Sequence, residues 1–131
     1  MRTNVELLAP AGSFEALQAA VQNGCDAVYL GGTMFGARAF AHNFDDTQME
    51  TAVKYAHVYG VRVYVTVNTL LYEKEMEEVV AYVKRLQDMD VDALIIQDPG
   101  ILNMDLPPIC LHASTQMHNY ELERIKFLDQ L

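Results

Sequence analysis

The sequence has little of what marks membrane, secreted or cysteine-metal proteins. It contains two cysteines, Cys25 and Cys110, which form no CxxC or CxxH pair and are predicted to be buried, reduced thiols. No apolar run approaches the roughly 20 residues that a membrane span needs. The N-terminus also lacks the apolar stretch and cleavage site of a signal peptide. These absences predict a cytoplasmic protein with no membrane contact and no metal site of its own.

Positive charge is also scarce. Nine Lys and Arg face eighteen Asp and Glu, for a net charge of −9. This balance disfavours nonspecific nucleic-acid binding by the segment, because phosphate affinity comes from clustered Lys and Arg. RNA remains open as a substrate that another part of a longer protein would hold. The acidic runs Glu73–Glu78 and Asp88–Asp92 are interpreted as solvated helix ends.

Hydrophobic residues make up 51% of the 131-residue chain, enough for one substantial core. Short apolar strands alternate with segments of helical periodicity, which predicts a parallel α/β sheet. The five expected strands are Leu7–Ala9, Ala27–Leu30, Arg62–Val67, Ala93–Ile96 and Cys110–His112. A closed (β/α)₈ barrel needs eight such units and about 250 residues. Residues 1–131 are therefore expected to form the N-terminal part of a TIM-like barrel, without a second domain.

Four helical segments are expected between and after these strands. Ser13 and Asp45 or Asp46 are predicted N-caps, with Gly24 and Gly60 at helix ends. Inward-facing stripes are read at three- and four-residue steps, in the last helix as Leu122, Ile125 and Leu128 after a cap at Asn119. Only a short helical turn fits before Pro107-Pro108.

Ligands of parallel α/β proteins bind at the C-terminal ends of the strands. Arg38 lies in a long loop after the second strand, where it could clamp a carboxylate or phosphate or serve as a surface arginine. Asn68 and Gln97 end the third and fourth strands, where an amide could orient a substrate or satisfy loop backbone. The turn at Gly31-Gly32 could admit a ligand or form a tight strand exit, and it is not a GxGxxG fingerprint.

Asp98 could act as a base or metal ligand, although Pro99-Gly100 after it favours a turn and helix cap. His112 is the catalytic candidate, because imidazole titrates near neutrality, with a structural histidine as the alternative. No Ser-His-Asp or Cys-His constellation can be read. Three further polar residues extend the candidate substrate-binding patch: Ser114, Thr115 and Gln116. The residues alone predict a polar barrel mouth without defining a reaction.

Six ordered motifs go further. They are Glu6-Leu-Leu-Ala-Pro-Ala-Gly-Ser, Gly24-Cys-Asp-Ala-Val-Tyr-Leu-Gly-Gly, Phe35-Gly-Ala-Arg-Ala, Tyr64-Val-Thr-Val-Asn-Thr-Leu, Asp92-Ala-Leu-Ile-Ile-Gln-Asp-Pro-Gly and Leu111-His-Ala-Ser-Thr-Gln. Together they resemble the start of the peptidase U32 family and span nearly the whole chain. The run from Gly100 to Ile109, followed by the His112 motif, is most similar to the ribosomal-RNA 5-hydroxycytidine synthase branch.

The resemblance implies a barrel-like catalytic domain and two activities. Some members are named as proteases, including collagenase-like ones; others hydroxylate RNA bases or ubiquinone precursors without molecular oxygen. The hydroxylating branches imply an iron–sulfur cluster bound by four cysteines downstream of Leu131, with prephenate used by the RNA-modifying ones.

Three functions are therefore expected to compete. The first is RNA base hydroxylation by a full-length protein, the second is peptidase activity of the collagenase type, and the third is an inactive fragment that self-associates. The 131 residues alone are expected to bind no cluster and to lack activity. Open sheet edges and an uncovered interior predict a homo-oligomer.

Overall fold

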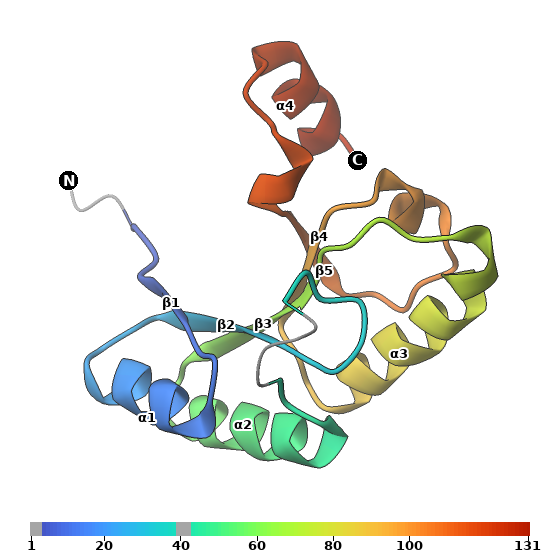
Figure 1. The fold of residues 1–131 in the computed structure, drawn as a ribbon. Coiled ribbons are helices and arrows are strands. Elements are labelled where there is room, and N and C mark those ends of the chain that lie inside the picture. The colour runs from blue at the N-terminus through green and yellow to red at the C-terminus, as the bar shows by residue number, and fades with distance from the viewer. Residues whose placement is uncertain (1–3, 39–42) are drawn as a thin grey trace.

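A computed structural model describes residues 4–38 and 43–131 as one five-stranded sheet with helices (Figure 1). All neighbouring strands are parallel and follow sequence order, β1-β2-β3-β4-β5. The strands are β1 (Leu8–Pro10), β2 (Ala27–Gly31), β3 (Arg62–Val67), β4 (Ala93–Ile96) and β5 (Cys110–Ala113). The predicted partial α/β barrel is confirmed at this level. Its strand bounds shift by at most one residue from those expected.

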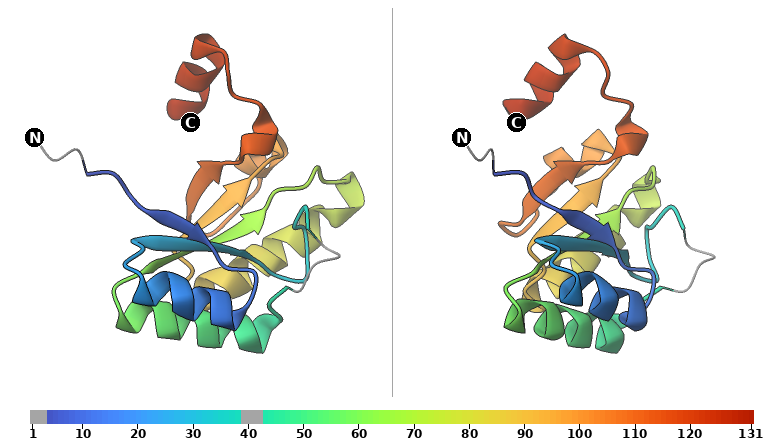
Figure 2. Two further views of the ribbon diagram at one scale, coloured as in Figure 1. Left: turned by 60° about the vertical axis from the view of Figure 1, so that its left-hand side comes forward. Right: turned by 90° about the vertical axis from the view of Figure 1, so that its left-hand side faces the viewer.

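Three helices cover one face of the sheet (Figures 1 and 2). They are α1 (Phe14–Gln22), α2 (Asp46–Val58) and α3 (Met76–Asp88), the last preceded by the 3₁₀ turn η1 (Glu73–Glu75). Two more 3₁₀ turns, η2 (Pro99–Asn103) and η3 (Thr115–Met117), flank β5, and α4 (Leu122–Asp129) follows. Connections that all pass over one face produce the winding of a barrel.

The helix boundaries follow from local chemistry. Ser13 Oγ accepts a hydrogen bond from the Ala16 amide at the start of α1. Asp45 begins α2 in a reciprocal capping box with Gln48, at 2.8 and 3.0 Å. These caps were predicted from sequence. So were the endings at Gly24 and Gly60, whose φ angles of 85° and 72° lie in the left-handed region that favours glycine.

The main core lies between the sheet and its helices. The alternating side chains of β3 distinguish the two faces of the sheet: Val63, Val65 and Val67 are fully buried against the helices. Tyr64 and Thr66 point to the other face. The largest fully buried side chains of the helix layer are Leu17, Met49, Tyr82 and Leu86. The main core occupies only this side of the sheet. The opposite face carries a smaller buried cluster of Ala27, Tyr64 and Ala93, with Tyr29 and Ile95 packed against it.

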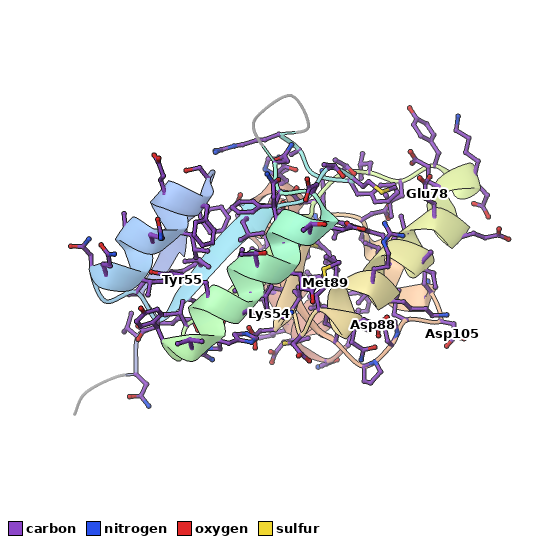
Figure 3. All side chains as sticks on the ribbon, turned by 90° about the horizontal axis from the view of Figure 1, so that it is seen from below. Lys54, Tyr55, Glu78, Asp88, Met89 and Asp105 are labelled. Carbon is purple, nitrogen blue, oxygen red and sulfur yellow. The ribbon has the colours of Figure 1, made fainter. Side chains whose placement is uncertain are left out.

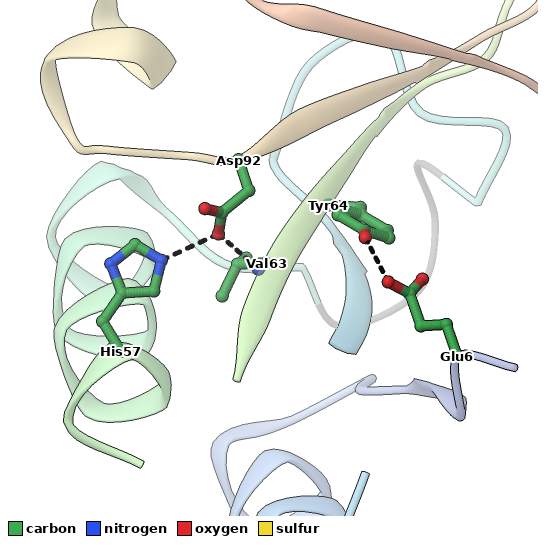
Figure 4. A network of polar contacts seen from close by, with 5 residues as sticks. All are labelled: Glu6, His57, Val63, Tyr64 and Asp92. Atoms are coloured by element: carbon green, nitrogen blue, oxygen red, sulfur yellow. Dashed lines mark hydrogen bonds and ion pairs between the residues drawn. The ribbon is translucent and has the colours of Figure 1, made fainter. Parts of the chain in front are cut away.

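A hydrogen-bonded contact ties the helix layer to the N-terminal end of the sheet (Figure 4). His57 Nε2 of α2 lies 2.7 Å from Asp92 Oδ2, and the same oxygen accepts from the Val63 amide at 2.7 Å. In barrels this end carries stability, whereas ligands bind at the other end. We therefore assign the contact a structural role.

Of the acidic residues expected to be solvated, Glu78 and Asp88 are exposed on the outer surface of the helix layer (Figure 3). Asp92 is an exception: it is half-buried because it binds His57 and the Val63 amide. The described residues include no helix long and apolar enough to cross a membrane.

Three predictions about the chain's second half are wrong. Helix α4 does not turn an apolar stripe inward: none of its residues is buried, and it begins after Glu121 without a side-chain cap, rather than at Asn119. It stands on the side of the sheet opposite α1–α3 (Figure 2). Cys110 is exposed, because its strand places it on the uncovered face, whereas Cys25 is buried as expected. Burial and the neighbouring Asp26 raise the pKa of the Cys25 thiol.

Candidate functional site

A cavity of about 690 Å³ opens at the C-terminal end of the sheet, on the face opposite α1–α3. It is lined by residues of all five strands, by the loop after β2 and by the turn after β5. The polar residues in its wall are Arg38, Asn43, Thr66, Asn68, His112, Ser114, Thr115 and Gln116. Five of the seven residues proposed from sequence, together with Thr115, thus meet at one cavity.

Strand register brings the central residues together. Gly31 pairs with Thr66, Thr66 with Ile95, and Ile95 with His112, so these four form one layer across the sheet. Parallel neighbours in register point to the same face. All four therefore face the cavity from four different strands. Because Gly31 has no side chain, the Asn43 side chain can approach the strand closely: a Cβ at Gly31 would lie only 3.1 Å from Asn43 Oδ1.

His112 rests on the aromatic ring of Tyr64, one layer below. The ring centroids are 4.6 Å apart at 73°, an edge-on contact. Tyr64 Oη donates a 2.7 Å hydrogen bond to Glu6 Oε2, which also lies 2.9 Å from the Arg62 guanidinium (Figure 4). Burial, followed by the contact with Glu6, raises the pKa of Tyr64 to about 12. The Tyr64 side chain is thus neutral at physiological pH and is held in a fixed position against the His112 imidazole.

Asn68 fixes the loop that carries Arg38. Its Oδ1 accepts a 3.0 Å hydrogen bond from the Ala37 amide, and Thr69 Oγ1 donates to the Phe35 carbonyl at 3.2 Å. Asn68 therefore satisfies loop backbone and lines the cavity at the same time. Arg38 stays exposed at the cavity wall, where its guanidinium is available to an anionic group. Residues 39–42 of this loop, including Ala39 of the third motif, lie outside the described residues.

The turn after β5 forms another wall. Ser114 is 4% exposed, its Oγ accepts from the Gln116 amide at 3.2 Å, and its own amide donates to the Ile96 carbonyl. The Ser114 hydroxyl is thus engaged in shaping the turn. Thr115 and Gln116 follow it in the cavity wall.

Gln97 and Asp98 are not in the cavity wall. The Asp98 carboxylate accepts from the Gly100 amide at 2.8 Å and from the Leu71 amide at 3.0 Å. It begins η2 and links the turns after β3 and β4. This favours the turn-and-cap interpretation of Asp98 over a base or metal ligand.

Sequence reasoning missed several wall residues, notably Tyr29, Thr66 and Asn43. Two-residue alternation along β2 and β3 could have found Tyr29 and Thr66, because both lie opposite the valine and leucine positions of the core. Asn43 had no such signal, since its position depends on the path of the long loop.

The described residues do not fit an iron–sulfur cluster. Cys25 packs in the helix-side core and Cys110 lies on the open face of the sheet. No group of three or more His, Cys, Asp or Glu within 4–38 and 43–131 could hold a metal ion. The cavity instead offers a guanidinium for an anion, amides for hydrogen bonding, an imidazole for proton exchange and the ring of Tyr29 for stacking.

Fold and cavity define an α/β protein of the barrel-forming class with a polar site at the strand ends. Residues 12–131 match the model of peptidase family U32, and the chain belongs to this family.

Three relatives show how names divide within the family. The chain is 44% identical over 129 residues to the 23S rRNA 5-hydroxycytidine C2501 synthase of Escherichia coli strain K12, covering 97% of this chain and 19% of that protein. It is 37% identical to tRNA hydroxylation protein P1 of Bacillus subtilis strain 168, covering 93% and 30%. It is 30% identical to a collagenase of Porphyromonas gingivalis, again covering 93% and 30%. The chain thus spans less than a third of each relative.

A solved structure supports the fold. The U32 peptidase Mk0906 superposes with a TM-score of 0.66 at 16% identity, over 88% of this chain and 52% of that one. At this identity the likeness shows the architecture alone.

Proposed function

We propose that this chain forms the first part of an RNA base hydroxylase that produces 5-hydroxycytidine in ribosomal RNA. The main observation that supports this proposal is the 44% identity to the E. coli 23S rRNA 5-hydroxycytidine synthase across 97% of the chain. The tRNA hydroxylation protein at 37% supports the same chemistry.

The cavity suits one extruded nucleobase. Enzymes that modify a base take it out of the stack and recognise its edge by hydrogen bonds and its face by stacking. In this proposal Tyr29 and Ile95 face the ring, Asn68 and Gln116 contact the polar edge, and Arg38 binds a phosphate or carboxylate. His112 would exchange a proton with the substrate. With a net charge of −9, most phosphate contacts would come from other parts of the full protein.

The hydroxylation chemistry of this proposal needs groups that the described residues do not hold. We assign the iron–sulfur ligands and the oxidant, if the full protein uses them, to regions beyond Leu131. The part proposed for this chain is binding and orientation of the base.

A chimera tests the proposal. The segment of the E. coli synthase aligned with this chain is replaced by residues 1–131, and the chimera is expressed in a strain without the synthase. Mass spectrometry of 23S rRNA should detect 5-hydroxycytidine. His112→Ala should lower it at least about a hundredfold, the lower end of the range for acid–base groups. Arg38→Ala should lower it too, because the guanidinium that binds the phosphate or carboxylate is lost. Lys54→Ala, on the exposed helix side, is the matched control. A soluble chimera that forms no 5-hydroxycytidine would overturn the proposal.

The second candidate is a peptidase, favoured by the collagenase at 30% identity. Cleavage of gelatin by a full-length protein containing this segment, lost on His112→Ala, would support it.

A further inference from the structure

The imidazole of His112 is oriented by an aromatic contact and not by a hydrogen bond. His112 is half-buried in the cavity wall, and its ring nitrogens make no hydrogen bond to residues 4–38 or 43–131. Its ring packs edge-on against Tyr64, with the centroids 4.6 Å apart at 73°. Edge-on packing is a preferred geometry of aromatic pairs. Tyr64 therefore restricts the imidazole while both ring nitrogens stay available to a substrate.

A small residue on β4 makes this contact possible. Tyr64 of β3 pairs with Ala93 of β4, and Ala93 pairs with Cys110 of β5, so β4 lies between the two aromatic rings. Ala93 is 1% exposed and packs in the same buried cluster as Tyr64. Because its side chain is only a methyl group, the Tyr64 ring can reach across β4 to His112, two residues beyond Cys110.

The Tyr64 ring is held from its far end by the segment that precedes β1. Tyr64 is 4% exposed, and its Oη donates a 2.7 Å hydrogen bond to Glu6 Oε2 (Figure 4). Glu6 in turn lies 2.9 Å from the Arg62 guanidinium. The raised pKa of Tyr64, about 12, keeps the phenol protonated and able to donate at physiological pH. Three separate parts of the chain thus converge on one imidazole.

We propose that Tyr64 is a positioning residue for His112 and that Glu6 acts through Tyr64. This inference rests on the proposed function, in which His112 exchanges a proton with the extruded base. A proton-transfer group must lie within hydrogen-bond reach of its target, and a misplacement of about 1 Å can lower a rate by about a hundredfold. Tyr64 and Glu6 are not among the residues that line the cavity. Their role is to hold the imidazole in one orientation.

Substitutions in the chimera test this role through activity. Tyr64→Leu removes the ring and should lower 5-hydroxycytidine at least about tenfold. Tyr64→Phe and Glu6→Ala each remove the hydrogen bond and keep the ring, and each should lower 5-hydroxycytidine severalfold, the scale of one net hydrogen bond. The double variant should match Tyr64→Phe alone, because Glu6 then has no phenol to act through. Val83→Ala, a truncation in the buried helix-side core, is the matched control and should leave the yield unchanged.

NMR of the 131-residue chain measures the position of His112 without any activity. The chain contains four histidines, and the His112 signals are those that disappear in His112→Ala. The ring current of Tyr64 should displace the His112 ring protons from their unfolded-state resonances. Tyr64→Phe should keep most of this displacement and Tyr64→Leu should abolish it, whereas Val83→Ala should leave it unchanged. Circular dichroism shows whether each variant is folded.

The outcomes separate this inference from the proposed function. Unchanged 5-hydroxycytidine or unchanged His112 resonances in a folded Tyr64→Leu variant would overturn the positioning role. If Tyr64→Leu does not fold, the Tyr64→Phe and Glu6→Ala cycle decides: a further loss on Glu6→Ala in the Tyr64→Phe background would contradict action through Tyr64. An inactive wild-type chimera overturns the proposed function instead, and the NMR comparison then still decides whether Tyr64 orients His112.

Discussion

Replacing Gly32 by alanine tests how the helix layer fixes the end of β2. A Cβ at Gly32 would lie on top of the Tyr82 hydroxyl oxygen, 3.2 Å from Tyr82 Cζ and 3.6 Å from Met49 Cε. Gly32 has no positive φ, so the backbone accepts alanine and the cost is steric. Gly32→Ala is expected to lower the free energy of unfolding by about 2–3 kcal/mol, the range of overpacked cores.

Tyr82→Phe should rescue this substitution. The Tyr82 hydroxyl is buried without a hydrogen-bond partner, and an unpaired buried polar group costs about 1–3 kcal/mol. Its removal also leaves a small void, so Tyr82→Phe alone should change stability by less than about 1 kcal/mol. In the double variant the new methyl group occupies the vacated space, with a shift of a few tenths of an ångström at Cζ. The coupling energy should then exceed about 1.5 kcal/mol.

Urea unfolding followed by circular dichroism measures all four variants of this cycle. Gly12→Ala is the control, because a Cβ there meets nothing within 4 Å, and it should be neutral or slightly stabilising. If Gly32→Ala is as destabilising in the Tyr82→Phe background as in the wild type, the steric explanation is wrong.

Two other predictions follow from single groups. Asp98→Ala removes the acceptor of the Leu71 and Gly100 amides and should cost about 1–3 kcal/mol in urea unfolding, whereas exposed Asp105→Ala should be neutral; equal effects would contradict the capping role. Burial, followed by the nearby Asp46 carboxylate, raises the pKa of Tyr82 to about 12. Because the folded-state pKa lies above the unfolded value of about 10, the contribution of neutral Tyr82 is complete below pH 10 and is lost as pH rises towards 12. Tyr82→Phe should therefore lose less stability than the wild type between pH 9 and 11.5, and identical losses would refute this assignment.

Local signals predicted the strand-helix order and most helix caps correctly. Ser13, Asp45, Gly24 and Gly60 each act through neighbours within a few residues, so their roles can be read from sequence. The cavity was predictable at the level of strand ends, which is why Arg38, Asn68 and His112 meet there.

Properties that depend on packing between residues far apart in the sequence could not be predicted from the sequence. Periodicity in α4 predicts an apolar stripe but not the surface that the stripe meets, so Ile125 was wrongly assigned to the core. The predicted burial of Cys110 was wrong for a related reason. The position of a residue in a strand determines the face to which its side chain points, whereas its exposure depends on what covers that face. The Gly32–Tyr82 contact joins β2 to α3 and has no local signature.

The alternation within β3 explains how one short strand serves both stability and the site. Val63, Val65 and Val67 hold the helix layer, while Tyr64 and Thr66 alternate with them on the opposite face. Tyr64 is itself fixed by its hydrogen bond to Glu6 and packs its ring against His112, so this residue of the cavity wall is supported from the face opposite α1–α3. Substitutions that change the cavity can therefore leave the valine core untouched. This separation is why loss of function on His112→Ala, with unfolding unchanged, would report on chemistry at the site and not on the fold.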